Sequence, residues 1–471
     1  MLFEHRTRKE QDHMQLLTLD SLLLGLLAAT MVTALLLFRE NPFDPLSIFS
    51  YLYIPRFVVR PAFILLDLDT PFLAFLFREE PKALARETLM VFSVGYIAFI
   101  LAYLSFKGWS RRWIRSDSKG KGRYQTAISM RRLRFVTSIG ILVALGMIGY
   151  QVIRVGNVAE FMYASRHGLW DGLSFLRIIP NLTSLLAAFM LVESIKRRRG
   201  RALSAVFLIA SLLAPTLMGD RSAVVYPIIF IIALYTLSRP NVPVVYLAIG
   251  LVMIGGLMGA LDTARRSIFE NNRVNYWDTV EQADGDSPSV FRTMSKALNL
   301  SVFDHFMVVK QDFDYNNFLY GDFFVRGVIG LVPRTLWEEK PKTITSGNWF
   351  SETYLPGTAG KPFTGIGEWW INFGILGVFF GMTLSGLFCR IAWEWAKHRR
   401  NSSGCMLLYL VMILSMTSGG VIASNLPSMF VLTVAPLVLL NQILRTKQRT
   451  EKASSRKILG PAPQIAGRYS V

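Results

Sequence analysis

The chain has 471 residues, of which 52% are hydrophobic and 13% aromatic, and its 51 Lys and Arg against 32 Asp and Glu give a formal net charge of +19. A mean hydropathy of +0.37 excludes an ordinary water-soluble domain and indicates a polytopic membrane protein. Two cysteines are too few for a disulfide framework or a Cys/His metal cluster. The charge does not indicate a nucleic-acid partner, because the sequence contains no basic folded domain with interleaved aromatic residues.

Apolar runs of about 20 residues, the length that crosses a bilayer, predict ten membrane spans. They cover 15–38, 88–106, 135–153, 174–195, 202–218, 222–237, 244–261, 366–391, 404–422 and 426–444. The first run is too long for a signal-peptide core, so we expect an uncleaved anchor. We therefore expect an all-α polytopic integral membrane protein.

A further apolar segment, 46–77, is interrupted by residues that a simple lipid-facing helix does not carry. They are Pro55, Arg56, Arg60, Pro61 and Asp67. This pattern favours a broken or re-entrant element that does not cross the membrane.

The distribution of Lys and Arg predicts the side on which each short loop lies. Basic residues concentrate in 107–134, 196–201, 397–400 and the tail from 445. With ten spans, all four regions lie in the cytoplasm, together with both termini. The positive net charge of the chain is then explained by topology. One large outer loop lies between the eighth and ninth membrane segments, with the broken element counted as a segment. The chain divides into an N-terminal membrane part, the outer loop, a C-terminal membrane part and a basic tail, at 1–262, 263–365, 366–444 and 445–471.

The ten residues from Gly365 to Gly374 place the carboxylate of Glu368 near the start of an apolar span. A charge at that position is costly unless it has a task, so we interpret Glu368 as part of a site at the outer membrane boundary. The alternative is an ion pair that only positions the span.

Arginines also gather at the outer ends of spans. Arg221 follows the short outer turn that begins at Gly219, where helix N–H groups and a guanidinium together favour phosphate oxygens. The alternative is that Arg221 caps Asp220 or contacts lipid headgroups. The same two interpretations apply to a further set of arginines, Arg177, Arg265, Arg266 and Arg334.

The outer loop contains an apolar stretch at 322–337 that we expect to lie on the outer leaflet as an amphipathic helix. Asn348, Trp349 and Glu352 follow it, and aromatic rings beside amide and acid groups suit the C–H faces and hydroxyls of sugars. An interfacial aromatic belt is the alternative. His305 and its neighbouring acids do not supply the ligand geometry of a divalent metal, so a solvated loop is the better interpretation.

These features resemble the bacterial oligosaccharide repeat-unit polymerases of the O-antigen polymerase (Wzy) type. The resemblance covers roughly 202–444. It rests on Gly-Asp-Arg-Ser at 219–222, Val-Pro-Arg at 332–334, Lys-Pro at 340–341 and the Gly-Glu-Trp-Trp-x-Asn-Phe-Gly run at 367–374. It implies a GT-C-like glycosyltransferase of the bacterial inner membrane with a periplasmic active site and no nucleotide sugar or cofactor. Its substrates would be polyprenyl-pyrophosphate-linked oligosaccharides in the lipid bilayer, with room for a protein partner that regulates chain length.

Transfer from a lipid pyrophosphate requires cations at the leaving group and a base at the attacking hydroxyl. We assign the pyrophosphate to the outer arginines and the base to Glu368, with His305 as its substitute. Sugar contacts fall to the outer-loop residues above and to Trp369 and Asn372 of the 367–374 run. This predicts inverting displacement without a metal. An O-antigen ligase acting on lipid A–core, and a flippase or transporter with cations at mid-membrane, remain alternatives.

Overall fold

The structure is a computed structural model of the chain, and it describes residues 24–33, 35, 43–108, 127–165, 178–218, 227–234, 300–313, 316–329, 346–356, 363–398 and 403–417, with the isolated positions 332, 337–339, 341, 434, 437–438, 442 and 445–446. Five helices of this part are long and apolar enough to cross a membrane, by length and composition. The described chain is almost wholly helical, so the all-α, multi-pass membrane class is confirmed. The full number of spans and the course of the outer loop stay predictions.

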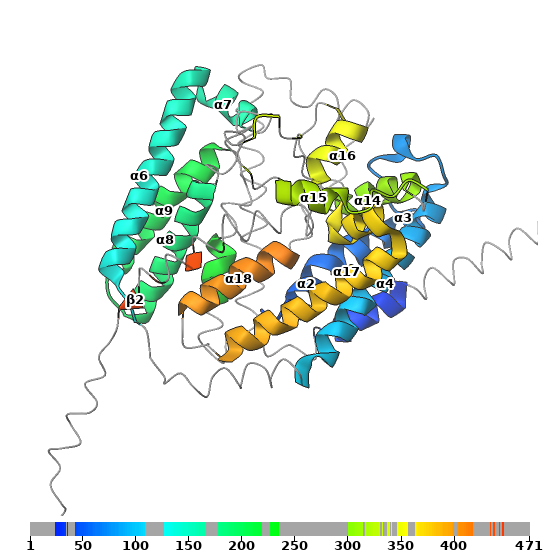
Figure 1. Ribbon diagram of the computed structural model, residues 1–471, viewed down its shortest axis with the longest axis horizontal. Coiled ribbons are helices and arrows are strands. Elements are labelled where there is room, and N and C mark those ends of the chain that lie inside the picture. Colours follow the sequence, from blue (N-terminus) through cyan, green and yellow to red (C-terminus); the bar gives the residue numbers. More distant parts are fainter. Residues whose placement is uncertain are drawn as a thin grey trace, which may run out of the picture.

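The helices lie in two groups (Figure 1). One contains α6 (Met130–Val155), α7 (Val158–Ala164), α8 (Ile178–Lys196) and α9 (Arg201–Leu217). The other contains α2 (Pro45–Ile54), the π-helical turn η1 (Pro55–Val59), α3 (Arg60–Leu65), the 3-10 turn η2 (Ala74–Leu76), α4 (Pro81–Ser105), α14 (Ser301–Asp312), α15 (Asp322–Ile329), α16 (Ser346–Tyr354) and α17 (Thr364–His398). α18 (Ser403–Thr417) lies between the groups, and the short strands β1 (Ala127–Ile128) and β2 (Arg445–Thr446) pair antiparallel.

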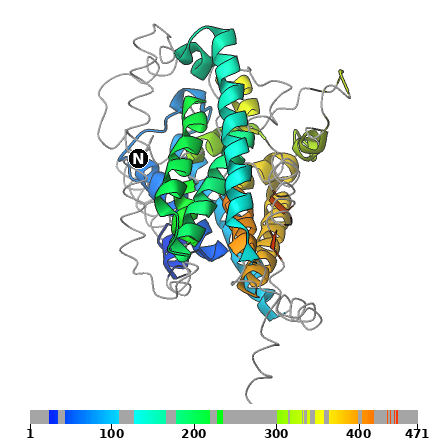
Figure 2. The same ribbon diagram turned by 90° about the vertical axis from the view of Figure 1, so that its left-hand side faces the viewer.

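The α6, α8 and α9 group presents apolar side chains outward. α6 and α9 pack side by side (Figure 2). Leu142 and Ile153 of α6 and Ile209 of α9 are among the exposed large hydrophobic residues. A soluble protein rarely exposes such a continuous apolar face, whereas a lipid-facing helix requires one.

In the second group, the helix from Pro45 to Leu65 runs antiparallel to α4. At one end the Tyr103 hydroxyl donates to Asp44 at 2.6 Å, and further along the Ser50 and Tyr96 hydroxyls lie 2.8 Å apart. Beyond them the rings of Phe57 and Phe92 stack, with centroids 3.8 Å apart. The pairing fills this interface with aromatic rings.

α2, η1 and α3 form one continuous run of 21 residues that is long enough to cross a membrane. The break expected from the two prolines is present, but only as the π-helical turn. The Arg60 N–H donates to the Pro55 carbonyl, five residues earlier, so the helix continues past both prolines. This course favours a spanning helix over the re-entrant element that the sequence predicts for 46–77.

α17 is kinked at Gly374, whose φ of 61° and ψ of −150° are outside the helical region. Only glycine adopts such a conformation without strain. The segment before the kink folds back along the segment after it, because Trp369 lies against Gly381 and Ile366 lies with Val378 and Met382 around Gly95 of α4. Residues 364–373 are therefore a separate short helix beside the span, and not the first turns of a straight one.

Three short helices cover this end of the group. Lys310 of α14 forms an ion pair with Glu87 of α4, and Phe306 of α14 packs against Gly367 of α17. α16 is joined to α14 through Tyr354, where burial and a hydrogen bond to Asp312 raise the pKa of the tyrosine. α15 ends at Ile329, so only the first half of the helix expected over 322–337 is described as helical.

Candidate functional site

The predicted site residues divide into two sets. Seven lie in the described part of the chain, and these are Glu368, His305, Asn348, Trp349, Glu352, Trp369 and Asn372. The five predicted pyrophosphate arginines, Arg177, Arg221, Arg265, Arg266 and Arg334, lie outside the described residues. The geometry below therefore concerns the carboxylate side of the predicted site.

Glu368 is completely buried on the folded-back segment of α17. Its neighbours on that segment contact different helices: Gly367 packs against Phe306 of α14, and Ile366 reaches Gly95 of α4. A buried carboxylate at this depth is expensive, since desolvation disfavours the charge unless a cation or a polar site compensates it. The position is that of a functional or ion-paired group, and not of a solvated surface residue.

Two arginines interrupt the helix from Pro45 to Leu65, which we term the broken helix. Arg56 belongs to the π-helical turn and is half-buried. Tyr53, in the last turn of α2, is buried, and its ring stacks with those of Phe57 and Phe92.

A second cation, Arg60, lies one turn further along and is completely buried. Its Nε and Nη2 donate to the two carboxylate oxygens of Asp304 at 3.0 and 2.7 Å, and its Nη1 donates to Asp69 at 2.5 Å. Nη2 also donates to the Thr70 carbonyl, and the Phe72 N–H donates to Asp304 at 2.7 Å. This network fastens α14 and the loop after α3 to the helix from Pro45 to Leu65, and it uses four of the five N–H donors of Arg60.

His305 follows Asp304 on α14 and is also buried, so the solvated loop expected around His305 is wrong: both residues lie on a buried helix. Its ring lies 5.0 Å from that of Phe350 on α16, measured between centroids. The Arg60–Asp304 pair thus sets the position of the turn that carries His305, which stays a candidate substitute base.

Trp369 and Asn372 flank Glu368 in different ways. The Asn372 amide donates to the Glu368 carbonyl at 2.8 Å and accepts from the Gly321 N–H at 2.9 Å, so it joins the loop before α15 to the segment that carries the carboxylate. The Trp369 ring lies 4.6 Å from that of Phe324 on α15, between centroids. Asn372 therefore acts on the site through the backbone in this structure, and its predicted sugar contact stays a prediction.

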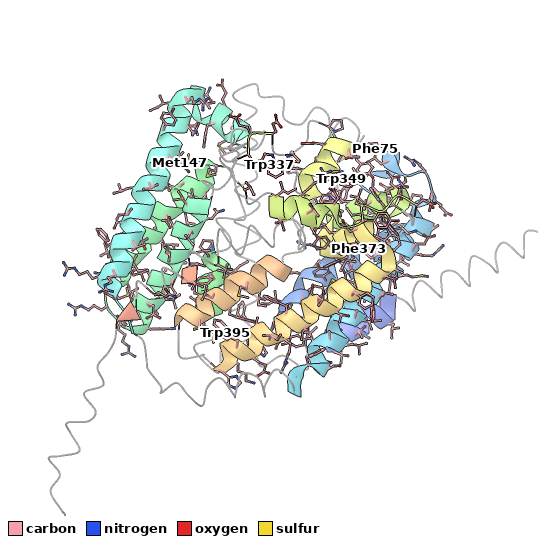
Figure 3. The ribbon with its side chains drawn as sticks, viewed as in Figure 1. Phe75, Met147, Trp337, Trp349, Phe373 and Trp395 are labelled. Carbon is pink, nitrogen blue, oxygen red and sulfur yellow. The ribbon has the colours of Figure 1, made fainter. Side chains whose placement is uncertain are left out.

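On α16, inward and outward faces are clearly separated. The Trp349 ring makes edge contacts with four aromatic rings, those of Phe313, Phe323, Tyr354 and Phe363. Figure 3 shows Trp349 near the junction of α15 and α16. Asn348 and Glu352, four residues apart, are exposed on the other face. Trp349 is thus a packing residue of the covering helices, while the polar pair lies on the exposed face of α16.

The described residues contain no group of three or more His, Cys, Asp or Glu arranged to hold a metal ion. The acids near His305 have other partners: Asp304 binds Arg60, and Asp312 lies 3.4 Å from Arg78. The chemistry that this part of the site offers is that of a buried carboxylate, a group that can accept a proton.

Sequence reasoning missed the buried pairing of Arg60. Arg56 and Arg60 are visible as charges within an apolar run, a pattern that indicates a broken helix. Charged residues inside a span are functional or paired by default, so the same signal also marks Arg60 as a candidate for pairing. Its pairing with Asp304, 244 positions later, has no local signature.

Comparison with known proteins finds a family match. The model of one family, described as "Putative O-antigen polymerase", matches residues 59–423, which is more than half of the chain. No curated protein and no solved structure matches the chain. The matched region contains Arg60, Asp304, His305 and Glu368. The chain belongs to the O-antigen polymerase family.

Proposed function

We propose that this protein is a Wzy-type membrane glycosyltransferase that polymerises oligosaccharide repeat units carried on a polyprenyl pyrophosphate. The observation that carries the proposal is the fully buried Glu368, held on the folded-back segment of α17, in a chain of the O-antigen polymerase family. The site belongs on the periplasmic face of the bacterial inner membrane, as the distribution of basic residues predicts.

In the proposed reaction, Glu368 accepts the proton of a sugar hydroxyl on the acceptor repeat. The hydroxyl oxygen then bonds to the anomeric carbon of the donor, and the bond from that carbon to the pyrophosphate oxygen breaks. The electron pair of the broken bond leaves on the pyrophosphate. One base and one nucleophile give direct displacement with inversion, and the arginines 177, 221, 265, 266 and 334 are proposed to take up the charge in place of a metal.

The sugar contacts are proposed from the covering helices. Asn348 and Glu352 expose an amide and a carboxylate on one face of α16, at the spacing of one helical turn. Their donors and acceptors suit sugar hydroxyls. Trp369 and Asn372 complete the proposed contacts next to the base.

A flippase for the same lipid is the second candidate, and one observation favours it. Arg56 lies near the middle of the helix from Pro45 to Leu65, and cations at mid-membrane are also what a transporter of lipid pyrophosphates requires. An O-antigen ligase uses the same donor but transfers it to lipid A–core. These candidates differ in their products, so one assay separates them.

The assay uses the purified full-length protein in nanodiscs, supplied with a polyprenyl-pyrophosphate-linked repeat unit, with chelator and without nucleotide sugar. A ladder of products that differ by one repeat supports the polymerase. Transfer that appears only after addition of lipid A–core indicates the ligase, and no transfer under either condition indicates the flippase.

Glu368→Gln is expected to lower the rate of polymerisation by about 10² to 10⁴, because the amide cannot accept the proton. Glu80→Gln is the matched control, since Glu80 is an exposed carboxylate before α4 whose side chain does not cap that helix. Full activity in Glu368→Gln would refute the assignment of the base, provided that the wild type forms the ladder.

A further inference from the structure

A basic surface lies at one end of the helix group that contains α6, α8 and α9. α6 and α9 begin at this end, and α8 ends there. The Arg134 guanidinium of α6 reaches the turn between α8 and α9, because its Nη2 lies so close to Gly200 that a Cβ on that glycine would clash with it. The short strands β1 and β2 pair at the same end (Figure 1). We define the basic surface as Arg131, Arg134 and residues 196–201.

Cations exceed acids on the basic surface. Neither α6 nor α9 has an acidic residue in its first turn. Glu193, near the end of α8, lies 3.7 Å from Lys196 and 3.5 Å from Arg197, so its charge is already shared by two cations. Four further exposed arginines form no ion pair with another described residue, and these are Arg131, Arg198, Arg199 and Arg201. The surface therefore carries guanidinium groups whose charge no described acid neutralises.

The basic surface continues directly into the lipid-facing sides of α6 and α9. Arg131 lies on the same face of α6 as Phe135 and Leu142, since they follow it by 4 and 11 positions, and these two side chains are 65% and 71% exposed. On α9, Val206 and Ile209 are exposed within about two turns of the first residue. Cations thus lie next to apolar surface that is long enough to contact acyl chains.

This combination distinguishes between possible anions. A free phosphate would use the arginines alone, and an acidic protein segment would approach from the water, away from the apolar faces. An anionic phospholipid uses both parts of the surface. Its phosphate oxygens accept hydrogen bonds from the planar guanidinium groups, and its acyl chains lie along the exposed apolar side chains.

We propose that the basic surface binds the headgroup of an anionic phospholipid, with its phosphate held by Arg131 of α6 and Arg201 of α9. Arg131 lies one turn before Arg134, and Arg201 follows Gly200, so the contact between Arg134 and Gly200 brings both arginines within reach of one headgroup. Basic pockets between membrane helices are known to take such headgroups. The distribution of basic residues predicts that this leaflet is the cytoplasmic one. The inference goes beyond the proposed polymerisation and does not depend on it.

The test compares two double variants of the full-length protein that remove the same number of charges. Arg131→Gln/Arg201→Gln changes the basic surface. Lys107→Gln/Lys397→Gln is the matched control, since both lysines are exposed and lie in regions that the distribution of basic residues predicts on the same side of the membrane. All four substituted side chains are exposed, so we expect both variants to fold, and thermal unfolding verifies this.

The readout is the affinity for dioleoyl phosphatidylglycerol in dodecyl maltoside micelles, measured by native mass spectrometry. Dioleoyl phosphatidylcholine has the same chains and a headgroup without net charge. We expect the Arg131/Arg201 variant to bind phosphatidylglycerol more weakly than the wild type by about tenfold or more, because each cation near an anionic headgroup adds to the attraction. Its affinity for phosphatidylcholine should be unchanged, and the lysine control should match the wild type with both lipids.

Equal affinities of the wild type and the Arg131/Arg201 variant for phosphatidylglycerol would overturn the proposal and favour an acidic protein segment as the partner. An equal loss in the lysine control would also overturn it, since the effect would then arise from the overall charge of this side. Displacement of phosphatidylglycerol by glycerol 3-phosphate would show that the surface takes a free phosphate ester and not a lipid. Because no donor is present, these results do not depend on the ladder assay.

Discussion

The Arg60–Asp304 pair offers the clearest quantitative test of how this fold is held together. Asp304→Asn changes one atom of the side chain and removes its charge. In the wild type, one carboxylate oxygen accepts from Arg60 Nε, while the other accepts from Arg60 Nη2 and from the Phe72 N–H. An amide has only one acceptor oxygen, so its NH2 group would face a donor of the guanidinium or of the backbone.

The magnitude follows from burial. Both side chains have 0% exposure, and removing one partner of a buried ion pair typically costs about 3–5 kcal/mol because the other charge remains buried. Asp69→Asn is the matched control on the same guanidinium. Asp69 has 16% exposure and accepts one hydrogen bond from Arg60, which an amide oxygen can also accept. Its loss should therefore cost only about 1 kcal/mol.

The assay is equilibrium unfolding in mixed micelles with increasing dodecyl sulfate, followed by tryptophan fluorescence. We expect Asp304→Asn to be clearly less stable than Asp69→Asn. The double variant Arg60→Met/Asp304→Leu should recover most of the loss, because it leaves neither partner of the pair as a lone buried charge. Equal effects of the two Asn variants, or a double variant worse than Asp304→Asn, would show that this network does not fasten α14.

Two further predictions concern other parts of the bundle. Burial raises the pKa of Asp44 from 3.8 to about 6. A carboxyl whose pKa is higher in the folded state stabilises the fold less as the pH rises from about 4 to 6, so the wild type should lose on the order of 3 kcal/mol of stability relative to Asp44→Asn over that range. Parallel stability profiles of the two proteins would contradict this. Gly381→Ala should lower both stability and activity, since a Cβ there would clash with the Trp369 ring. The control is Gly149→Ala, which should behave as the wild type in the same unfolding and ladder assays because open space surrounds Gly149.

Much of the helical framework is predictable from hydropathy alone. The expected spans 135–153 and 202–218 correspond to α6 at Met130–Val155 and α9 at Arg201–Leu217. The span expected at 88–106 corresponds to α4, which begins earlier, at Pro81. Its first turns carry charges that pair with other segments, such as Lys82 with Asp67, so hydropathy alone excluded them.

The pairings that build the site could not be predicted from the sequence. Arg60 meets Asp304 across 244 positions of the chain. Nothing local to either residue specifies the other, because the contact depends on how α14 packs on the broken helix. The fold-back of α17 was equally hidden, since Gly374 appears in the sequence as one of several glycines in an apolar run. Glu368 stands out in the sequence, because a carboxylate in such a run requires a reason, and its role as the base stays a prediction.

Two helical discontinuities in the described part of the chain carry charged residues. Non-helical backbone at membrane depth leaves polar groups that lipid cannot satisfy, so it is tolerated only where protein or a polar cavity surrounds it. Arg56 lies within the π-helical turn, and Glu368 lies on the segment that Gly374 folds back. α14 packs on the π-helical turn, and the folded-back segment reaches Gly95 of α4. Protein therefore covers both discontinuities, whereas a charge on a straight lipid-facing helix would have no such cover.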